Sequence, residues 1–350
     1  MNHELKFFSW KRIVIILLVG IGILLLIPRI IGLKQTVELL KQVKYWAFGL
    51  ALFSESFFYI GSTLLTRAVL RMTGDKLKFG DVLRISLLDS FSLQFLPLGS
   101  FGEAAVDYYF LKEKNVRTSH IVLMFIARTI IVYLIFTLIF LIGVGFSPTN
   151  PSLSHGTLLI ILLIFIIAFS LFFYLISLYF RRELLIKRAN FAAMLVNKIL
   201  KIFHKRIPIE RIPNLIDKFY SAMGILAQNR RLQLSAFLGG LIFWAGDIFC
   251  LYFSLIGFGY LPHLPMVIFA YAVARVLALV SFIPGGLGVT EGALALVFIG
   301  FGIPSSVALA GVLIFRFISF WLTLPVGLGS FLSLQKKYIK MGIQGHFDVH

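Results

Sequence analysis

The chain has 350 residues, of which 59% are hydrophobic and only 14% are charged. Soluble domains carry about 25% charged residues, so this composition excludes an ordinary soluble protein and indicates a multi-pass membrane protein. The net charge of +18 is compatible with nucleic-acid binding. However, the basic residues flank apolar segments, so we expect anionic lipid headgroups as partners and no nucleic acid.

Six apolar segments are long enough to cross a bilayer, because about 20 helical residues span its hydrocarbon core. They cover residues 13–31, 45–67, 119–146, 157–180, 234–257 and 306–333. Two further apolar segments, 82–110 and 266–300, are interrupted by proline and glycine. Such interruptions break a helix and predict re-entrant pairs of half-helices. We therefore expect an all-α integral membrane protein with eight hydrophobic segments, six of them full transmembrane helices.

The basic residues also predict the orientation, because Lys and Arg favour the cytoplasmic side. Twelve of them, against three acids, lie in residues 181–231, so the linker 181–233 is expected inside the cell. Both termini are expected to be cytoplasmic, and the whole chain 1–350 is expected to form one domain in the cell membrane. The halves 45–146 and 234–333 then run in opposite senses, which predicts an inverted-topology repeat.

A proline–glycine motif that ends in glutamate occurs once in each half, at Phe95–Glu103 and at Phe282–Glu291. An arginine follows each glutamate at the same distance of 25 residues, as Arg128 and Arg316. Each arginine lies about 15 Å inside its segment at a helical rise of 1.5 Å, near the middle of a core about 30 Å thick. Charges at that depth are costly and usually functional.

Two interpretations of these charges remain open. Arg128 and Arg316 either pair with nearby carboxylates and only hold the hairpins in place, or they bind a lipid phosphate, which a guanidinium can do with two hydrogen bonds. Glu103 and Glu291 are expected in the first turn of the second half-helices. There they either complement the helix dipole, or pair with the two arginines, or couple to a proton or a cationic headgroup.

Further candidate binding residues surround these four. Glycine permits positive φ, and exposed amides at a helix start can bind an anion. The hairpin tips are therefore expected at Pro97, Gly99, Gly102, Pro284, Gly285, Gly286 and Gly288. Further charged residues lie at apolar depth: Glu55, Asp89, Asp107, Asp247 and Arg275. Of these, Glu55, Asp247 and Arg275 are expected to line the path of the lipid headgroup. Asp107 is alternatively expected at the membrane interface, near Lys112. No metal-ligand spacing and no familiar catalytic motif occurs, so no cofactor is expected.

The two motifs carry a family resemblance. The stretch Phe282–Ala293, together with Pro97, Gly102 and Glu103, resembles the lysylphosphatidylglycerol synthase transmembrane-region family, which includes flippase-like proteins and the membrane half of the multiple peptide resistance factor. The resemblance implies a membrane module that moves lipids, in particular aminoacylated phosphatidylglycerol, between leaflets. Its signature residues fall on Pro97, Gly102, Glu103, Pro284, Gly285, Gly286, Gly288 and Glu291.

The chain departs from that family in two respects. The resistance factor continues into a soluble aminoacyl-transferase domain, whereas this chain ends soon after its last apolar segment, so we expect no synthase activity. Many relatives carry an arginine after the first acidic motif, where this chain has Ala104 and Ala105, so the headgroup is left open. The expected function is lipid translocation. One alternative is a membrane-embedded enzyme that acts on lipid or isoprenoid phosphates, with Glu103 or Glu291 as general base. The other is a scaffold for a partner transferase. The sequence is also compatible with a homo-oligomer.

Overall fold

The computed structural model describes residues 41–95, 100–145, 181–200, 208–214, 229–281 and 283–334, with a few isolated positions between them. Every regular element within these residues is helical, and five of the helices are long and apolar enough to cross a membrane. The all-α membrane class is therefore confirmed. The predicted transmembrane segments 13–31 and 157–180 lie outside the described residues.

The first half of the bundle has two long helices with two shorter ones between them. These are α3 (Tyr45–Met72), α4 (Phe79–Phe95), α5 (Ser100–Lys112) and α6 (Thr118–Gly145). Polar contacts join the linkers at one end of this half: His120 Nδ1 lies 2.7 Å from Asp75 Oδ2, and Lys114 Nζ donates to Asp81 Oδ2 at 3.1 Å. The linkers 71–84 and 111–118 therefore lie on one side of the bundle.

The second half has the same order of elements. They are α10 (Arg230–Ile256), α11 (Leu264–Ser281), the short turn η5 (Pro284–Gly286), α12 (Val289–Gly300), α13 (Ser305–Arg316) and the π-helical turn η6 (Phe317–Trp321), after which the helix continues to Leu334. Helix α11 has 18 residues and extends about 27 Å, and it is one of the five helices long and apolar enough to cross a membrane although it contains Arg275.

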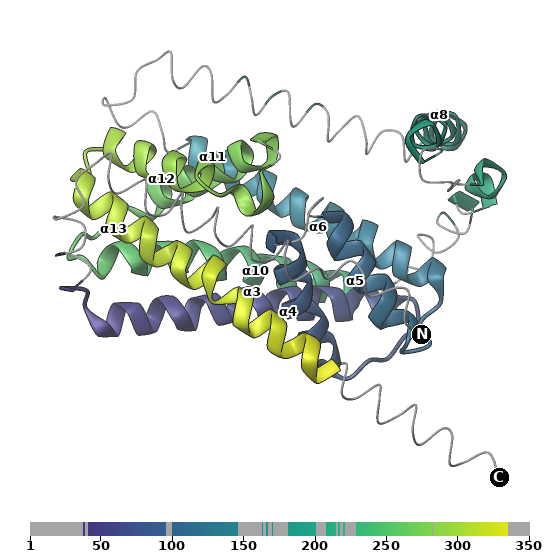
Figure 1. Ribbon diagram of the computed structural model, residues 1–350, viewed down its shortest axis with the longest axis horizontal. Helices are drawn as coiled ribbons and strands as arrows, with labels where there is room; N and C mark the ends of the chain where they lie inside the picture. The colour runs from purple at the N-terminus through teal and green to yellow at the C-terminus, as the bar shows by residue number, and fades with distance from the viewer. Residues whose placement is uncertain are drawn as a thin grey trace, which may run out of the picture.

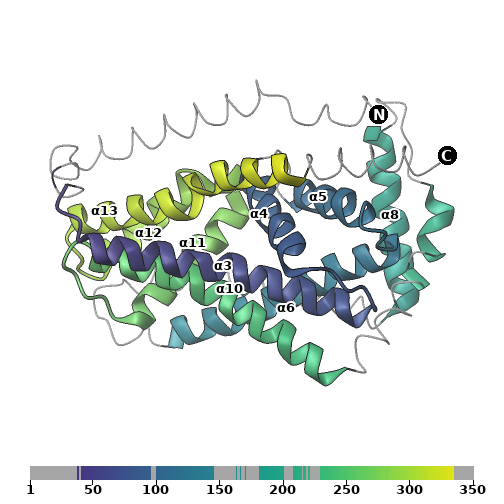
Figure 2. The same cartoon turned by 90° about the horizontal axis from the view of Figure 1, so that it is seen from below.

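The helices α3 and α10 pack antiparallel along the long axis of the bundle (Figures 1 and 2). Glycines allow their backbones to touch. A Cβ atom on Gly239 would lie 2.6 Å from the backbone nitrogen of Leu65, and one on Gly246 would lie 2.8 Å from the carbonyl oxygen of Ser54. The contact thus moves down α3 as it moves up α10. The first helices of the two halves therefore run in opposite directions.

Replacing Gly239 with alanine is expected to destabilise the protein by about 1–3 kcal/mol, because the new methyl group has to displace the backbone of α3. Gly49 on α3 provides the matched control, since a Cβ atom there has no neighbour within 4 Å. Gly49→Ala should be neutral or slightly stabilising, because alanine favours a helix over glycine. Thermal unfolding midpoints of the two purified variants test this. Equal unfolding midpoints of the Gly239→Ala and Gly49→Ala variants would contradict the close contact between the backbones of α3 and α10.

The shorter helices occupy opposite ends of the bundle and meet at its centre. Figures 1 and 2 show α4 and α5 toward one end and α11 and α12 toward the other. The end of α4 reaches both turns of the second half: Gln94 Nε2 donates to the carbonyl of Ser319 in η6 at 3.2 Å, and a Cβ atom on Gly285 in η5 would lie 3.2 Å from the Gln94 carbonyl oxygen.

Candidate functional site

Arg128 collects acidic side chains from two neighbouring helices. It lies on α6 and is 5% exposed. Its Nη1 donates to Asp89 Oδ2 at 3.1 Å and to Thr66 Oγ1 at 3.5 Å. Its Nη2 donates to Glu103 Oε1 at 2.7 Å and to Asp107 Oδ2 at 2.6 Å. Residues of α3, α4 and α5 thus converge on one guanidinium. We call Asp89, Glu103, Asp107 and Arg128 the Arg128 cluster.

Asp107 belongs to this cluster, and its alternative placement at the membrane interface near Lys112 stays a prediction. The side chain of Asp107 is fully buried, whereas that of Glu103 is 20% exposed. Asp107 follows Glu103 by four residues, so both lie on the same face of α5. The helix therefore turns both carboxylates toward Arg128.

Arg316 forms a smaller and electrically balanced pair. It ends α13 and is 4% exposed. Its Nε donates to Glu291 Oε1 at 2.7 Å, and its Nη2 donates to the carbonyl of Gly285 at 2.9 Å. The ring of Phe320 lies 4.5 Å from the guanidinium carbon and adds a cation–π contact. The second oxygen of Glu291 accepts the Gly288 N–H at 2.8 Å and so caps the start of α12.

The glycine-rich tip is what allows Arg316 to bind a backbone carbonyl. Gly285, Gly286 and Gly288 have φ values of +61°, +60° and +80°, which side chains other than glycine rarely adopt. At Gly285 a Cβ atom would also meet the ring of Phe320. The chain can therefore turn its carbonyl toward the arginine only with glycine at this position.

A third charged group lies between α10 and α11. Arg275 pairs through Nη2 with Asp247, and its Nε donates to the Tyr271 hydroxyl at 2.9 Å. The Tyr271 hydroxyl in turn donates to Asp247, which is completely buried. Glu55, on the adjacent α3, is 5% exposed, and its Oε2 has no hydrogen-bond partner among the described residues.

The structure brings together most of the residues that the sequence singled out. The pairs Glu103–Arg128 and Glu291–Arg316 are confirmed, and both glutamates lie in the first turn of their helices. Gly102 lies in α5, Pro284 begins η5, and Pro97 and Gly99 are outside the described residues. The binding role of all these residues stays a prediction.

Two polar partners were missed from the sequence. Thr66 gave no signal, because threonine is common in membrane helices. Tyr271 was recognisable in principle, since it precedes Arg275 by four residues and must share its helix face. Asp89 and Asp107 were recognised as deeply placed acids but not as partners of Arg128.

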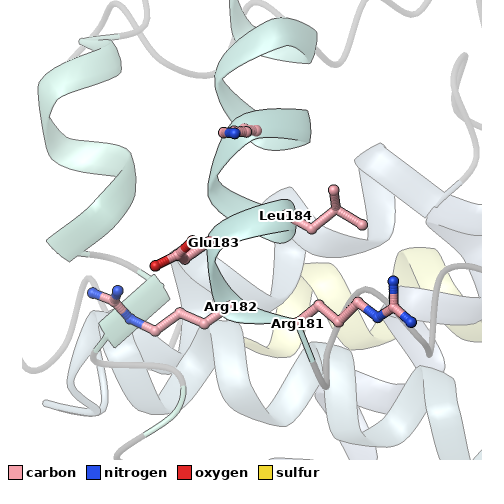
Figure 3. A pocket seen from close by; sticks show the side chains of 5 residues that line it. Arg181, Arg182, Glu183 and Leu184 are labelled. Carbon is pink, nitrogen blue, oxygen red and sulfur yellow. The ribbon is translucent and has the colours of Figure 1, made fainter.

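The basic linker contributes a separate charged surface. Its helix α8 (Arg182–Leu200) packs against the short turn η4 (Ile209–Arg211). Figure 3 shows Arg181 and Arg182 directed to opposite sides of the start of α8, in a surface pocket also lined by Glu183, Leu184 and Lys187. Arg182 Nη2 lies 2.6 Å from Asp217 Oδ1, so one cation is already paired within the protein.

The long apolar helices and the buried ion pairs between them define a polytopic helical membrane protein with charged groups inside its helix bundle. Within the described residues, no group of three or more His, Cys, Asp or Glu side chains is arranged to hold a metal ion. The chain belongs to the lysylphosphatidylglycerol synthase TM region family, which matches residues 13–327. This membership confirms the resemblance that the two motifs indicated.

Curated relatives occur in archaea. The chain is 30% identical over 128 residues to a UPF0104 membrane protein of Pyrococcus horikoshii, a match that covers 37% of this chain and 38% of the relative. It is 29% identical over 131 residues to a UPF0104 membrane protein of Methanothermobacter thermautotrophicus, covering 35% of this chain and 39% of the relative. The match thus spans about two fifths of the length of these relatives.

Proposed function

We propose that this protein is a lipid translocase that moves a phosphate-bearing lipid headgroup between the two leaflets. The observation that supports the proposal is the pair of buried arginines, Arg128 and Arg316, each paired with the glutamate that precedes it by 25 residues. A guanidinium remains charged in a membrane and matches the geometry of a phosphate. The depth of both arginines suits a headgroup in transit.

The proposed mechanism uses an inverted repeat. The two halves have the same order of elements, and their first helices run antiparallel. In transporters built from inverted repeats, the substrate site lies between the halves, and rocking of one half against the other exposes it to each side in turn. In this protein the tips of α4–α5 and α11–α12 would reach the site from opposite sides, with α11 long enough to cross the membrane by itself, and the acyl chains would remain in lipid.

The charges favour a headgroup that carries both signs. Arg128 and Arg316 provide positive charge for a phosphate. Glu103, the partly exposed acid of the Arg128 cluster, provides negative charge for an amine. Zwitterionic and aminoacylated phospholipids have both groups, which agrees with the substrate class implied by the family. The cations at the start of α8 are a second place for anionic headgroups, at the membrane surface.

Leaflet-resolved transport in sealed vesicles tests the function. The purified protein is reconstituted with a fluorescent headgroup-labelled phospholipid, and an impermeant reductant is added outside. Bleaching of the inner-leaflet fraction, absent from protein-free vesicles, is the expected result. A chemically altered lipid product formed in detergent, where no leaflets exist, would instead support the membrane-embedded enzyme. Neither transport nor product would point to a scaffold for a partner transferase.

A further inference from the structure

The Arg128 cluster carries more negative charge than its arginine balances. Three carboxyl groups contact one guanidinium, so the cluster has a formal charge of −2 when all of them are ionised. The second half differs, because Arg316 and Glu291 neutralise each other. A surplus charge in the hydrocarbon region is unfavourable, so the resting cluster requires additional positive charge.

The additional positive charge is needed next to the carboxyl groups of Asp89 and Asp107. Their side chains are 4% and 0% exposed. Each uses Oδ2 to accept a hydrogen bond from Arg128, and each leaves Oδ1 without a hydrogen-bond partner among the described residues. Buried polar atoms are normally satisfied, so two such oxygens in one cluster indicate a missing donor. Glu103 is partly exposed and has no such requirement.

The surroundings of these two carboxyl groups identify the donor as a proton. Helix α3 contributes the neutral Thr66 hydroxyl, α5 contributes Glu103, and α6 contributes Arg128 and Tyr133, of which Tyr133 interacts electrostatically with Glu103. Within the described part of the chain, Arg128 is the one cation that interacts with Asp89 or Asp107. Nor do these acids have the arrangement of a metal site.

We propose that Asp89 and Asp107 share one proton in the resting protein, and that loss and uptake of this proton couple a pH difference to lipid movement. Two carboxyl groups in one site hold a proton between them because two adjacent buried negative charges repel each other. The unpartnered Oδ1 atoms are where the proton binds. The shared proton follows from the cluster alone, whereas the coupling rests on the proposed function.

Infrared spectroscopy of the purified full-length protein tests the shared proton without any transport. The wild-type protein at neutral pH should show the carbonyl stretch of a protonated carboxyl group, shifted in heavy water. Asp89→Asn and Asp107→Asn should each remove this band, because the remaining aspartate pairs with Arg128 in its ionised form. Asp81→Asn is the matched control on α4, since Asp81 already contacts Lys114 and Arg84. It should leave the band unchanged.

A wild-type protein without the band, or a band that survives either substitution, would overturn the shared proton. The coupling is tested in sealed vesicles by imposing pH gradients of both signs. Translocation should be faster under one gradient than the other in the wild type, and this difference should be absent from Asp107→Asn. Translocation at equal rates under both gradients would overturn the coupling. Absence of any translocation would contradict the proposed function and leave the infrared result standing.

Discussion

The substitution Arg128→Met is expected to lower the free energy of unfolding by at least about 3 kcal/mol. The reason is that Asp89, Glu103 and Asp107 all depend on the same guanidinium. Its removal leaves three carboxyl groups in a buried site without a counter-charge. Unfolding of the purified protein in detergent, followed by loss of helical signal against denaturant, measures the difference.

Two controls accompany this prediction. Arg128→Lys keeps the charge but loses the planar fork that donates from both Nη atoms, so its stability should lie between those of the wild type and of Arg128→Met. Asp107→Asn removes part of the charge surplus and should cost much less. If Asp107→Asn were as unstable as Arg128→Met, the cluster would be held together by the aspartate and not by the arginine.

Arg316→Met is expected to cost about 3–5 kcal/mol, because Glu291 would remain buried and charged without a partner. A second substitution, Glu291→Gln, should recover most of this loss. Removing both members of a buried ion pair is often close to neutral, and glutamine still has an oxygen that can accept the Gly288 N–H. Chemical unfolding of the single and double variants forms a double-mutant cycle that measures the coupling.

A surface pair provides the comparison for this cycle. Arg182 and Asp217 are about half exposed and 2.6 Å apart, so Arg182→Met should change stability by no more than about 1 kcal/mol. An equal effect of Arg182→Met and Arg316→Met would show that Arg316 is not buried. A double variant as unstable as Arg316→Met alone would show that the stability depends on contacts of the arginine other than Glu291.

The sequence predicted the charge pairs because their geometry is encoded in spacing. Glu103 and Glu291 each precede an arginine by 25 residues, and a hairpin tip followed by a helix and a turn brings those positions to the same depth. The left-handed glycines of the second tip were equally recognisable, since Pro284 and three neighbouring glycines have few other uses. Local rules were sufficient for these features.

Features that depend on helix rotation were not predictable in the same way. Asp107 is close in sequence to Lys112, which indicated an interface, but the rotation of α5 against α6 turns it inward. Asp247 and Arg275 were recognised one by one, but their pairing depends on how α10 packs against α11.

Translocation by the Arg316→Met/Glu291→Gln double variant is the most direct test of the central claim that the buried arginines bind the headgroup. This variant is expected to fold, so a loss of activity cannot be attributed to unfolding. In sealed vesicles with the labelled phospholipid, we predict a rate at least about tenfold below that of the wild type, equivalent to ~1.4 kcal/mol of transition-state stabilisation. A folded double variant that transports at the wild-type rate would contradict the account and reduce Arg316 to a structural residue.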